Sequence, residues 1–184
     1  MPKTDYLNGF NINIKDYDQN NLITYSLINN KVYQAYLTIL KAFEPDYKRS
    51  KEFEKNQIQK KVSQDDMINF VTNEVARNIK LSTDFLKQVP GFGEMSNEQL
   101  THVIKSGMMN FHIITVSPMI KNGESYMVFE NGINLSRKWL NKMRGKEKTD
   151  LKIQAAEGLN ELNITDREKA LLLVYMYTLP GIYD

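Results

Sequence analysis

The chain has 184 residues, with 24 Lys and Arg against 22 Asp and Glu, and no cysteine. This length fits one domain with a sizeable core, and the near balance of charge does not predict affinity for nucleic acid or membranes. The absence of cysteine excludes disulfides, zinc fingers, iron–sulfur clusters and a thiol nucleophile. No targeting segment is visible and no apolar run reaches the ~20 residues that span a bilayer, so we expect a soluble protein.

The N-terminal part of the chain is predicted to be a poorly ordered segment over residues 1–30, followed by a domain over residues 31–184. Asparagine recurs in the first thirty residues, and its side chain competes with helix formation by bonding to the backbone. Apolar residues then recur at helical spacing over residues 32–43, which predicts a first helix that Pro45 ends. Residues 44–61 are rich in Lys and Glu and are expected to form a surface connection, within which a short helix stays open.

A long helix is predicted over residues 63–89, the longest periodic segment of the chain. Ser63 followed by Asp66 resembles a capping box, although Asp replaces the usual Glu or Gln. Apolar residues lie along one face of the segment, and Pro90-Gly91 is expected to end it. A helix of this length is about 40 Å long and would cross a whole domain.

A buried central helix is predicted from Ser96, a good N-cap residue, to Ile120. The part from Met108 onward is apolar nearly all round, which is typical of a helix covered on every side. Pro118 is expected to kink this helix or to mark its last turns. Two adjacent features then predict a small β-hairpin: strand propensity over residues 125–129 and the turn signal Asn131-Gly132.

The last third of the chain is predicted to hold three helices. Ser136 caps a short helix, and Thr165 with Glu168 forms a full capping box for the last one. Between them, residues 151–162 are interpreted as an amphipathic helix whose apolar face comprises Leu151, Ala155, Leu159 and Leu162. With about seven helices, one small hairpin and no long sheet, the sequence predicts an all-α fold.

Motifs for catalysis are absent from the sequence. There is no phosphate-binding glycine loop, no zinc-protease helix motif and no calcium-binding loop. The two histidines leave little for a metal site, and we expect His102 to be a surface residue and His112 a partly buried one. We therefore expect a protein that is not an enzyme and needs no cofactor.

One stretch resembles the signature of nuclear hormone receptor ligand-binding domains. Residues 85–92 read Phe-Leu-Lys-Gln-Val-Pro-Gly-Phe, and residues 103–107 read Val-Ile-Lys-Ser-Gly at the family's spacing, without insertion. Residues 122–140 look like the β-turn and sixth helix of the subgroup with peroxisome-proliferator-activated and Rev-erb-type receptors. Residues 159–168 look like the junction between the seventh and eighth helices. The resemblance covers roughly Val32 to the C-terminus.

The resemblance implies a layered antiparallel helical sandwich with one small hairpin, incomplete at the C-terminus. The family's ninth helix, its dimerisation helix and its activation helix have no counterpart here. The chain is then a fragment, a natural truncation or a receptor with a reduced domain. The family's Asp-Gln pair falls at Gln99 and Leu100, displaced by one from Glu98-Gln99, and Asn110 replaces a glutamate that many members carry.

A coregulator groove is the first site that the resemblance implies. In the family, lysines at the positions of Lys87 and Lys105 bind the free carbonyl groups at the C-terminus of a coregulator helix. The groove floor would comprise Thr83, Leu100, Thr101 and Ile104. From pattern alone, the favoured interpretation of both lysines is that they are ordinary surface residues.

A pocket for a small lipophilic ligand is the second implied site. By register, the residues facing it would be Val71, Val75, Asn78, Ile79, Ser82, Met109, Ile113 and Tyr126. A filled core is the competing interpretation of the same apolar side chains. We expect no haem, because Rev-erb-type relatives bind it through Cys and His and this chain has no cysteine.

The leading hypothesis is a nuclear protein that regulates transcription by binding a coregulator helix, a lipophilic ligand or both. A location shared with the cytoplasm stays open, and this chain is expected to make no direct contact with nucleic acid or membrane. Its dimerisation is left open, since the usual dimer helix is absent. Two alternatives stay open: an all-α interaction domain that is not a receptor, and a dominant-negative isoform that does not respond to ligand.

Overall fold

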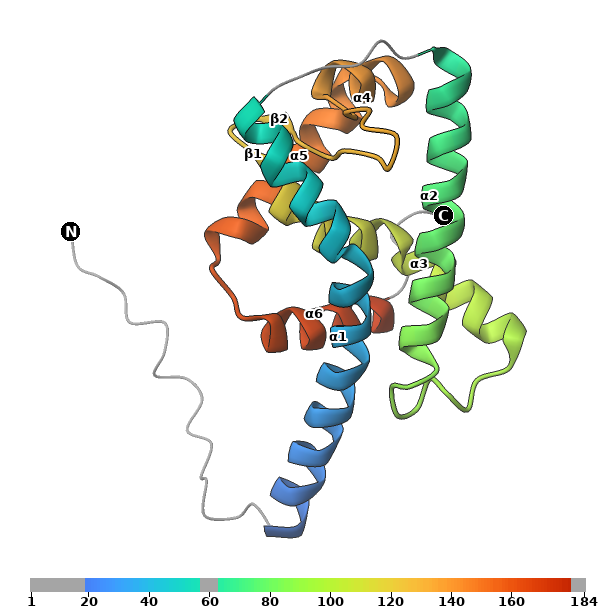
Figure 1. Cartoon of the computed structure of the whole chain (residues 1–184). Helices are drawn as coiled ribbons and strands as arrows, with labels where there is room; N and C mark the ends of the chain where they lie inside the picture. Colours follow the sequence, from blue (N-terminus) through green and yellow to red (C-terminus); the bar gives the residue numbers. More distant parts are fainter. Residues whose placement is uncertain (1–18, 57–62, 180–184) are drawn as a thin grey trace, which may run out of the picture.

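The computed structural model describes residues 19–56 and 63–179. These residues form an all-α fold with one small hairpin, as predicted. The elements in chain order are α1 (Gln19–Asn56), α2 (Gln64–Leu86), α3 (Asn97–Val116), η2 (Ser117–Met119), β1 (Ile120–Lys121), β2 (Glu124–Ser125), α4 (Arg137–Arg144), α5 (Lys146–Glu161) and α6 (Asp166–Thr178). The central element is α3, which packs against α1, α2, α5 and α6. Figure 1 shows α3 passing behind α1 and α2, with α6 crossing α1 lower in the view.

The first helix differs most from prediction. It starts at Gln19, so the expectation of a poorly ordered segment over residues 1–30 is wrong from that residue on, and residues 1–18 lie outside the described residues. The helix also continues through Pro45, and the expected surface connection is helical as far as Asn56. A proline inside a helix costs ~3 kcal/mol because one backbone hydrogen bond is lost. Burial on both sides of Pro45 offsets this cost, since Phe43 is 1% exposed and Asp46 is buried.

The N-terminal turns of α1 reach beyond the rest of the described fold. Figure 1 shows the blue end of α1 extending past α6. Leu22, Ile23, Tyr25 and Leu27 are all more than half exposed there. The buried face of α1 begins at Val32, where α6 lies against it.

The caps of α2 and α3 are the predicted ones. Ser63 and Asp66 form a reciprocal capping box, and so do Ser96 and Gln99. The last helix, α6, has the same motif at Thr165 and Glu168. Each of these motifs needs only residues three apart, so the local sequence is sufficient to place the helix start.

Two helix ends lie earlier than predicted. The chain leaves α2 after Leu86 and turns through Gly91, whose φ of +90° is a conformation that favours glycine. The central helix α3 ends at Val116 rather than Ile120, and Pro118 lies in the 3-10 turn η2. The chain therefore already changes direction where the sequence pattern predicts a continuous helix.

The hairpin forms one turn earlier than predicted. Strand β1 pairs with β2 around Asn122-Gly123, with Ile120 opposite Ser125. At the predicted turn Asn131-Gly132, the flanking segments share a single isolated bridge between Val128 and Asn134. Two backbone bonds also cross there, from Phe129 N to the Ile133 carbonyl at 3.0 Å and from Leu135 N to the Met127 carbonyl at 2.9 Å. The buried Asn134 side chain adds bonds to the carbonyl groups of Ser125 and Met127, at 3.0 and 3.2 Å. The predicted pairing is therefore present in part, as a short and irregular hairpin.

Helix α6 crosses α3 at Gly107, the glycine of the Lys-Ser-Gly motif. A Cβ atom there would overlap the ring of Tyr177, so this close approach requires glycine. The hydroxyl of Tyr177 donates to Ser82 Oγ at 2.8 Å, and both side chains are buried. This contact ties α6 to α2 across the central helix.

Candidate functional site

The predicted coregulator groove, made of Thr83, Lys87, Leu100, Thr101, Ile104 and Lys105, lies where α2 ends and α3 begins. Lys87 is the C-cap residue of α2, and its side chain, like those of Lys105 and Thr101, is exposed. Leu100 and Ile104 are buried at 4% and 6% exposure, so they form a packed layer beneath the exposed groups. Two unpaired surface cations over an apolar layer are able to bind an anionic or carbonyl-rich partner.

A hollow of about 780 Å³ lies against the same end of α3. Its lining includes Met95, Thr101, Val103 and Lys105. Met95 and Val103 are its apolar members, and the acid Glu98 lies in the same lining as the cation of Lys105. Of the predicted groove residues, Thr101 and Lys105 line this hollow, and Thr83, Lys87, Leu100 and Ile104 are not among its lining residues.

The predicted pocket residues fall into three groups. Asn78 and Ser82 are buried, while Val71, Ile113 and Tyr126 are half-buried. Val75, Ile79 and Met109 are 47%, 45% and 41% exposed, so the prediction that they face inward is wrong for the described residues. Their side chains point outward because no described element covers this face of α2 and α3. Ser82 Oγ accepts a hydrogen bond from the Tyr177 hydroxyl.

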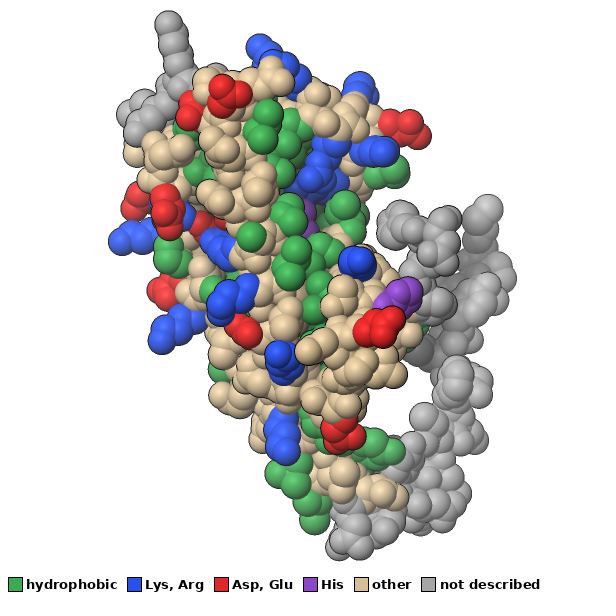
Figure 2. Space-filling view, turned by 90° about the vertical axis from the view of Figure 1, so that its right-hand side faces the viewer, with side chains coloured by type: hydrophobic (Ala, Val, Ile, Leu, Met, Phe, Trp, Pro, Cys, Tyr) green, Lys and Arg blue, Asp and Glu red, His purple; other side chains and the backbone are tan. Residues whose placement is uncertain are grey.

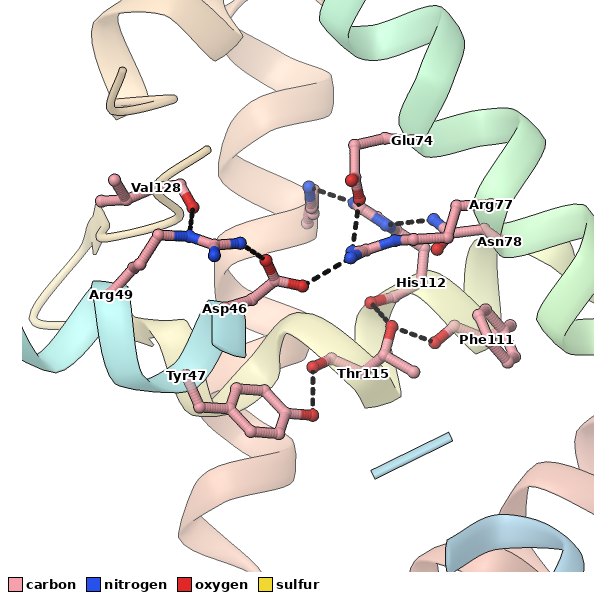
Figure 3. A network of polar contacts seen from close by, with 11 residues as sticks. Asp46, Tyr47, Arg49, Glu74, Arg77, Asn78, Phe111, His112, Thr115 and Val128 are labelled. Carbon is pink, nitrogen blue, oxygen red and sulfur yellow. Dashed lines mark hydrogen bonds and ion pairs between the residues drawn. The ribbon is translucent and has the colours of Figure 1, made fainter. Parts of the chain in front are cut away.

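A network of charged groups, not foreseen from the sequence, joins α1, α2 and the loop after β2. Asp46 lies between two arginines and forms ion pairs with Arg49 and, at 2.6 Å, with Arg77 (Figure 3). Arg77 also pairs with Glu74 at 2.8 Å, and Arg49 Nε donates to the carbonyl of Val128 at 3.1 Å. Each buried cation in this network therefore has a carboxylate partner, which is the usual condition for burying charge.

A second polar cluster continues from this network, through the Asn78–His112 contact, toward α5. The ring of His112 contacts Asn78 Nδ2 through Nδ1 at 3.3 Å and Lys152 Nζ through Nε2 at 2.7 Å. Figure 3 shows Asn78 and His112 beside the Asp46 network. We call Asn78, His112 and Lys152, with the neighbouring Arg144, the buried lysine cluster.

Proton positions in this cluster follow from its chemistry. A charged lysine only donates, so Nε2 of His112 accepts and Nδ1 keeps the ring proton. The group able to accept that proton is Asn78 Oδ1, which has no hydrogen-bond partner among the described residues when the amide nitrogen faces the ring. Burial, and then the Lys152 charge, hold the pKa of His112 well below its usual value, so the ring is neutral.

Lys152 is the most unusual residue of the fold, because it is a lysine only 4% exposed. Burial, and then the charge of Arg144, lower its pKa from 10.5 to about 7. Among the described residues, no carboxylate forms an ion pair with Lys152 or Arg144. The cluster thus places positive charge next to a neutral ring without a compensating anion.

The sequence analysis missed Lys152 because it assigned the wrong face of α5. Leu151 and Leu162 are 60% and 66% exposed, and Ala155 is exposed as well. The buried face contains Ile153, Ala156 and Leu159, which recur every three residues and were the available signal. Lys152 lies on this buried face, rotated away from the predicted one.

Other functional features are absent from the described parts of the chain. Within residues 19–56 and 63–179, no group of three or more His, Asp or Glu side chains could hold a metal ion. No helix described there is long and apolar enough to cross a bilayer. His102 is exposed and His112 half-buried, as expected.

Two comparisons with known proteins return no match. No protein-family model matches the chain, and no curated protein matches it.

Proposed function

We propose that this chain is a nuclear hormone receptor ligand-binding domain that regulates transcription by binding a coregulator helix, a lipophilic ligand or both. One observation carries the proposal. The two motif lysines, Lys87 and Lys105, are both exposed on helices that pack against each other, with buried Leu100 and Ile104 beneath them. The two motif lysines thus provide exposed positive charge next to apolar side chains, and a helical peptide needs both of these for binding.

The arrangement of helices supports the same proposal. A central α3 that contacts α1, α2, α5 and α6 favours a layered fold with crossing helices over a simple up-and-down bundle. The motif glycine Gly107 is explained by the close approach of Tyr177 from α6.

The proposed groove acts through charge and apolar contact together. A bound helix exposes unpaired carbonyl groups at its C-terminus, and lysine ammonium groups at that end satisfy them. Its apolar face would lie in the hollow lined by Met95 and Val103. Ligand would act by shifting the population of groove-competent states, and the site of action would be the nucleus.

The proposal is tested by titrating a fluorescent, leucine-rich coregulator peptide against the wild-type chain and the double variant Lys87→Ala/Lys105→Ala. We expect binding to weaken by about tenfold or more in the variant, since charge-assisted hydrogen bonds are lost. Lys41→Ala serves as the control, because Lys41 is an exposed lysine on α1, a helix that contributes nothing to the groove. Equal binding by both proteins, or no binding by either, would overturn the groove.

A further inference from the structure

Lys152 lacks the carboxylate partner that the half-buried arginines of the Asp46 network have among the described residues. Arg49 and Arg77, which are half-buried, share Asp46, and Arg77 has Glu74 in addition. Lys152 is more deeply buried than either arginine, yet its one hydrogen-bond partner among the described residues is the neutral ring of His112. Burying an unpaired ammonium group is costly, so a fold that keeps one is prepared for an anion.

Arg144 strengthens this interpretation. Its guanidinium group, from α4, is partly buried and lies close enough for its charge to lower the pKa of Lys152. Two cations that repel each other in a desolvated place destabilise the fold. A single negative charge between them would turn that repulsion into attraction.

The surroundings of the cluster are apolar and open. Asn78 lies on α2 between Val75 and Ile79, and His112 follows Met109 by one turn of α3; all three of these apolar side chains are more than 40% exposed. Figure 2 shows the corresponding side of the molecule, where hydrophobic side chains surround a histidine and basic side chains. An occupant that matches this surface has one negative group and an apolar body.

We propose that the buried lysine cluster binds the carboxylate of a hydrocarbon-tailed acid, with its tail along Val75, Ile79 and Met109. The proposal rests on the proposed function in one respect, that a lipophilic ligand binds against α2 and α3. It adds the chemical class of that ligand and the residues that select it. The carboxylate accepts hydrogen bonds from Lys152 and Arg144, while His112 continues to orient Lys152 through Nε2.

Calorimetric titration with three matched probes tests the proposal: dodecanoate, dodecan-1-ol and dodecylammonium. For the wild-type chain we expect dodecanoate to bind about tenfold or more tightly than the alcohol, and dodecylammonium to bind weakest. Lys152→Met should reduce the affinity for dodecanoate to the level of the alcohol while leaving the alcohol unchanged. Lys148→Met, an exposed lysine one turn earlier on α5, should preserve the preference for the acid.

A second variant, on another helix, keeps the test valid if Lys152→Met alters the fold. Arg144→Gln removes a charge from a partly exposed side chain of α4 and should also weaken binding of dodecanoate more than binding of the alcohol. Equal affinity of the wild-type chain for acid and alcohol would overturn the proposal, as would failure of every probe to bind or a preference that survives both substitutions. The peptide titration tests the groove, which lies toward the opposite end of α3 from the buried lysine cluster. Selective acid binding without peptide binding would therefore refute the groove and leave this inference standing.

Discussion

Two basic regions lie toward opposite ends of α3, and their lysines differ in solvent exposure. Lys87 and Lys105 are exposed and need no partner within the fold, because water solvates their charges. Lys152 is buried beside His112, and water cannot solvate it in the same way. The exposed pair costs the fold almost nothing, while the buried residue makes the fold less stable whenever it is protonated.

This difference shows that the two candidate binding sites are found by different evidence, one from a sequence motif and the other from the surroundings of a side chain in the fold. The exposed pair belongs to a contiguous motif, and its chemistry can be read from the residues around it. The buried lysine is part of no motif, and only its lack of a carboxylate partner sets it apart from the acid-paired arginines of the Asp46 network. Three substitutions test the contrast, in order of decreasing expected effect on stability.

Removal of the shared carboxylate should have the largest effect. Asp46→Ala leaves the charges of Arg49 and Arg77 with too few partners, and we expect a loss of about 3 kcal/mol in the free energy of unfolding. Chemical denaturation of the variant measures this loss. Glu44→Ala, an exposed position two residues earlier in α1, is the control and should change stability by about 0.5 kcal/mol or less. A similarly small change for Asp46→Ala would mean that the network contributes nothing to the fold.

Removal of the buried lysine should act in the opposite direction and depend on pH. The pKa of Lys152 is about 7 in the folded chain and 10.5 when unperturbed, so between these values the unfolded chain binds the extra proton. Wild-type stability should therefore rise from pH 7 to pH 10, with a slope of at most about 1.4 kcal/mol per pH unit. Lys152→Met should remove this slope and be the more stable protein near pH 7.

Thermal unfolding from pH 6 to pH 10 checks this prediction. The His112 pKa is lowered, so its contribution is confined to the range below 6.5 and does not overlap the window assigned to Lys152. Burial raises the pKa values of Tyr36 and Tyr47, so stability should fall again above pH 10, where the unfolded tyrosines ionise first. A slope between pH 7 and pH 10 that persists in Lys152→Met would contradict the assignment.

Removal of the exposed pair should have the smallest effect on stability. Lys87→Ala/Lys105→Ala should change the free energy of unfolding by about 0.5 kcal/mol or less, because neither lysine forms an ion pair among the described residues. Chemical denaturation under the conditions used for Asp46→Ala makes the two directly comparable. A loss of several kcal/mol would show that the pair stabilises the fold and would undermine its proposed role in binding.

The sequence could predict features that depend on a few neighbouring residues. The capping boxes at Ser63, Ser96 and Thr165 were predictable because their donors and acceptors lie three residues apart. Exposure of the motif lysines was also predictable, because an unpaired ammonium group is costly to bury. The continuation of α1 through Pro45 was not predictable, since a proline normally ends a helix and only the buried contacts of Phe43 and Asp46 offset that cost.

The sequence by itself determined an all-α chain, the starts of three helices and the spacing of a motif whose two lysines reach the surface. Tertiary structure decided which face of α5 is buried, because two apolar stripes compete on that helix and the packing of α3 selected the one with Ile153 and Ala156. That selection carried Lys152 into the interior. A charge without a carboxylate partner is visible only when the groups around it are known, and for this reason the buried lysine cluster emerged from the fold and not from the sequence.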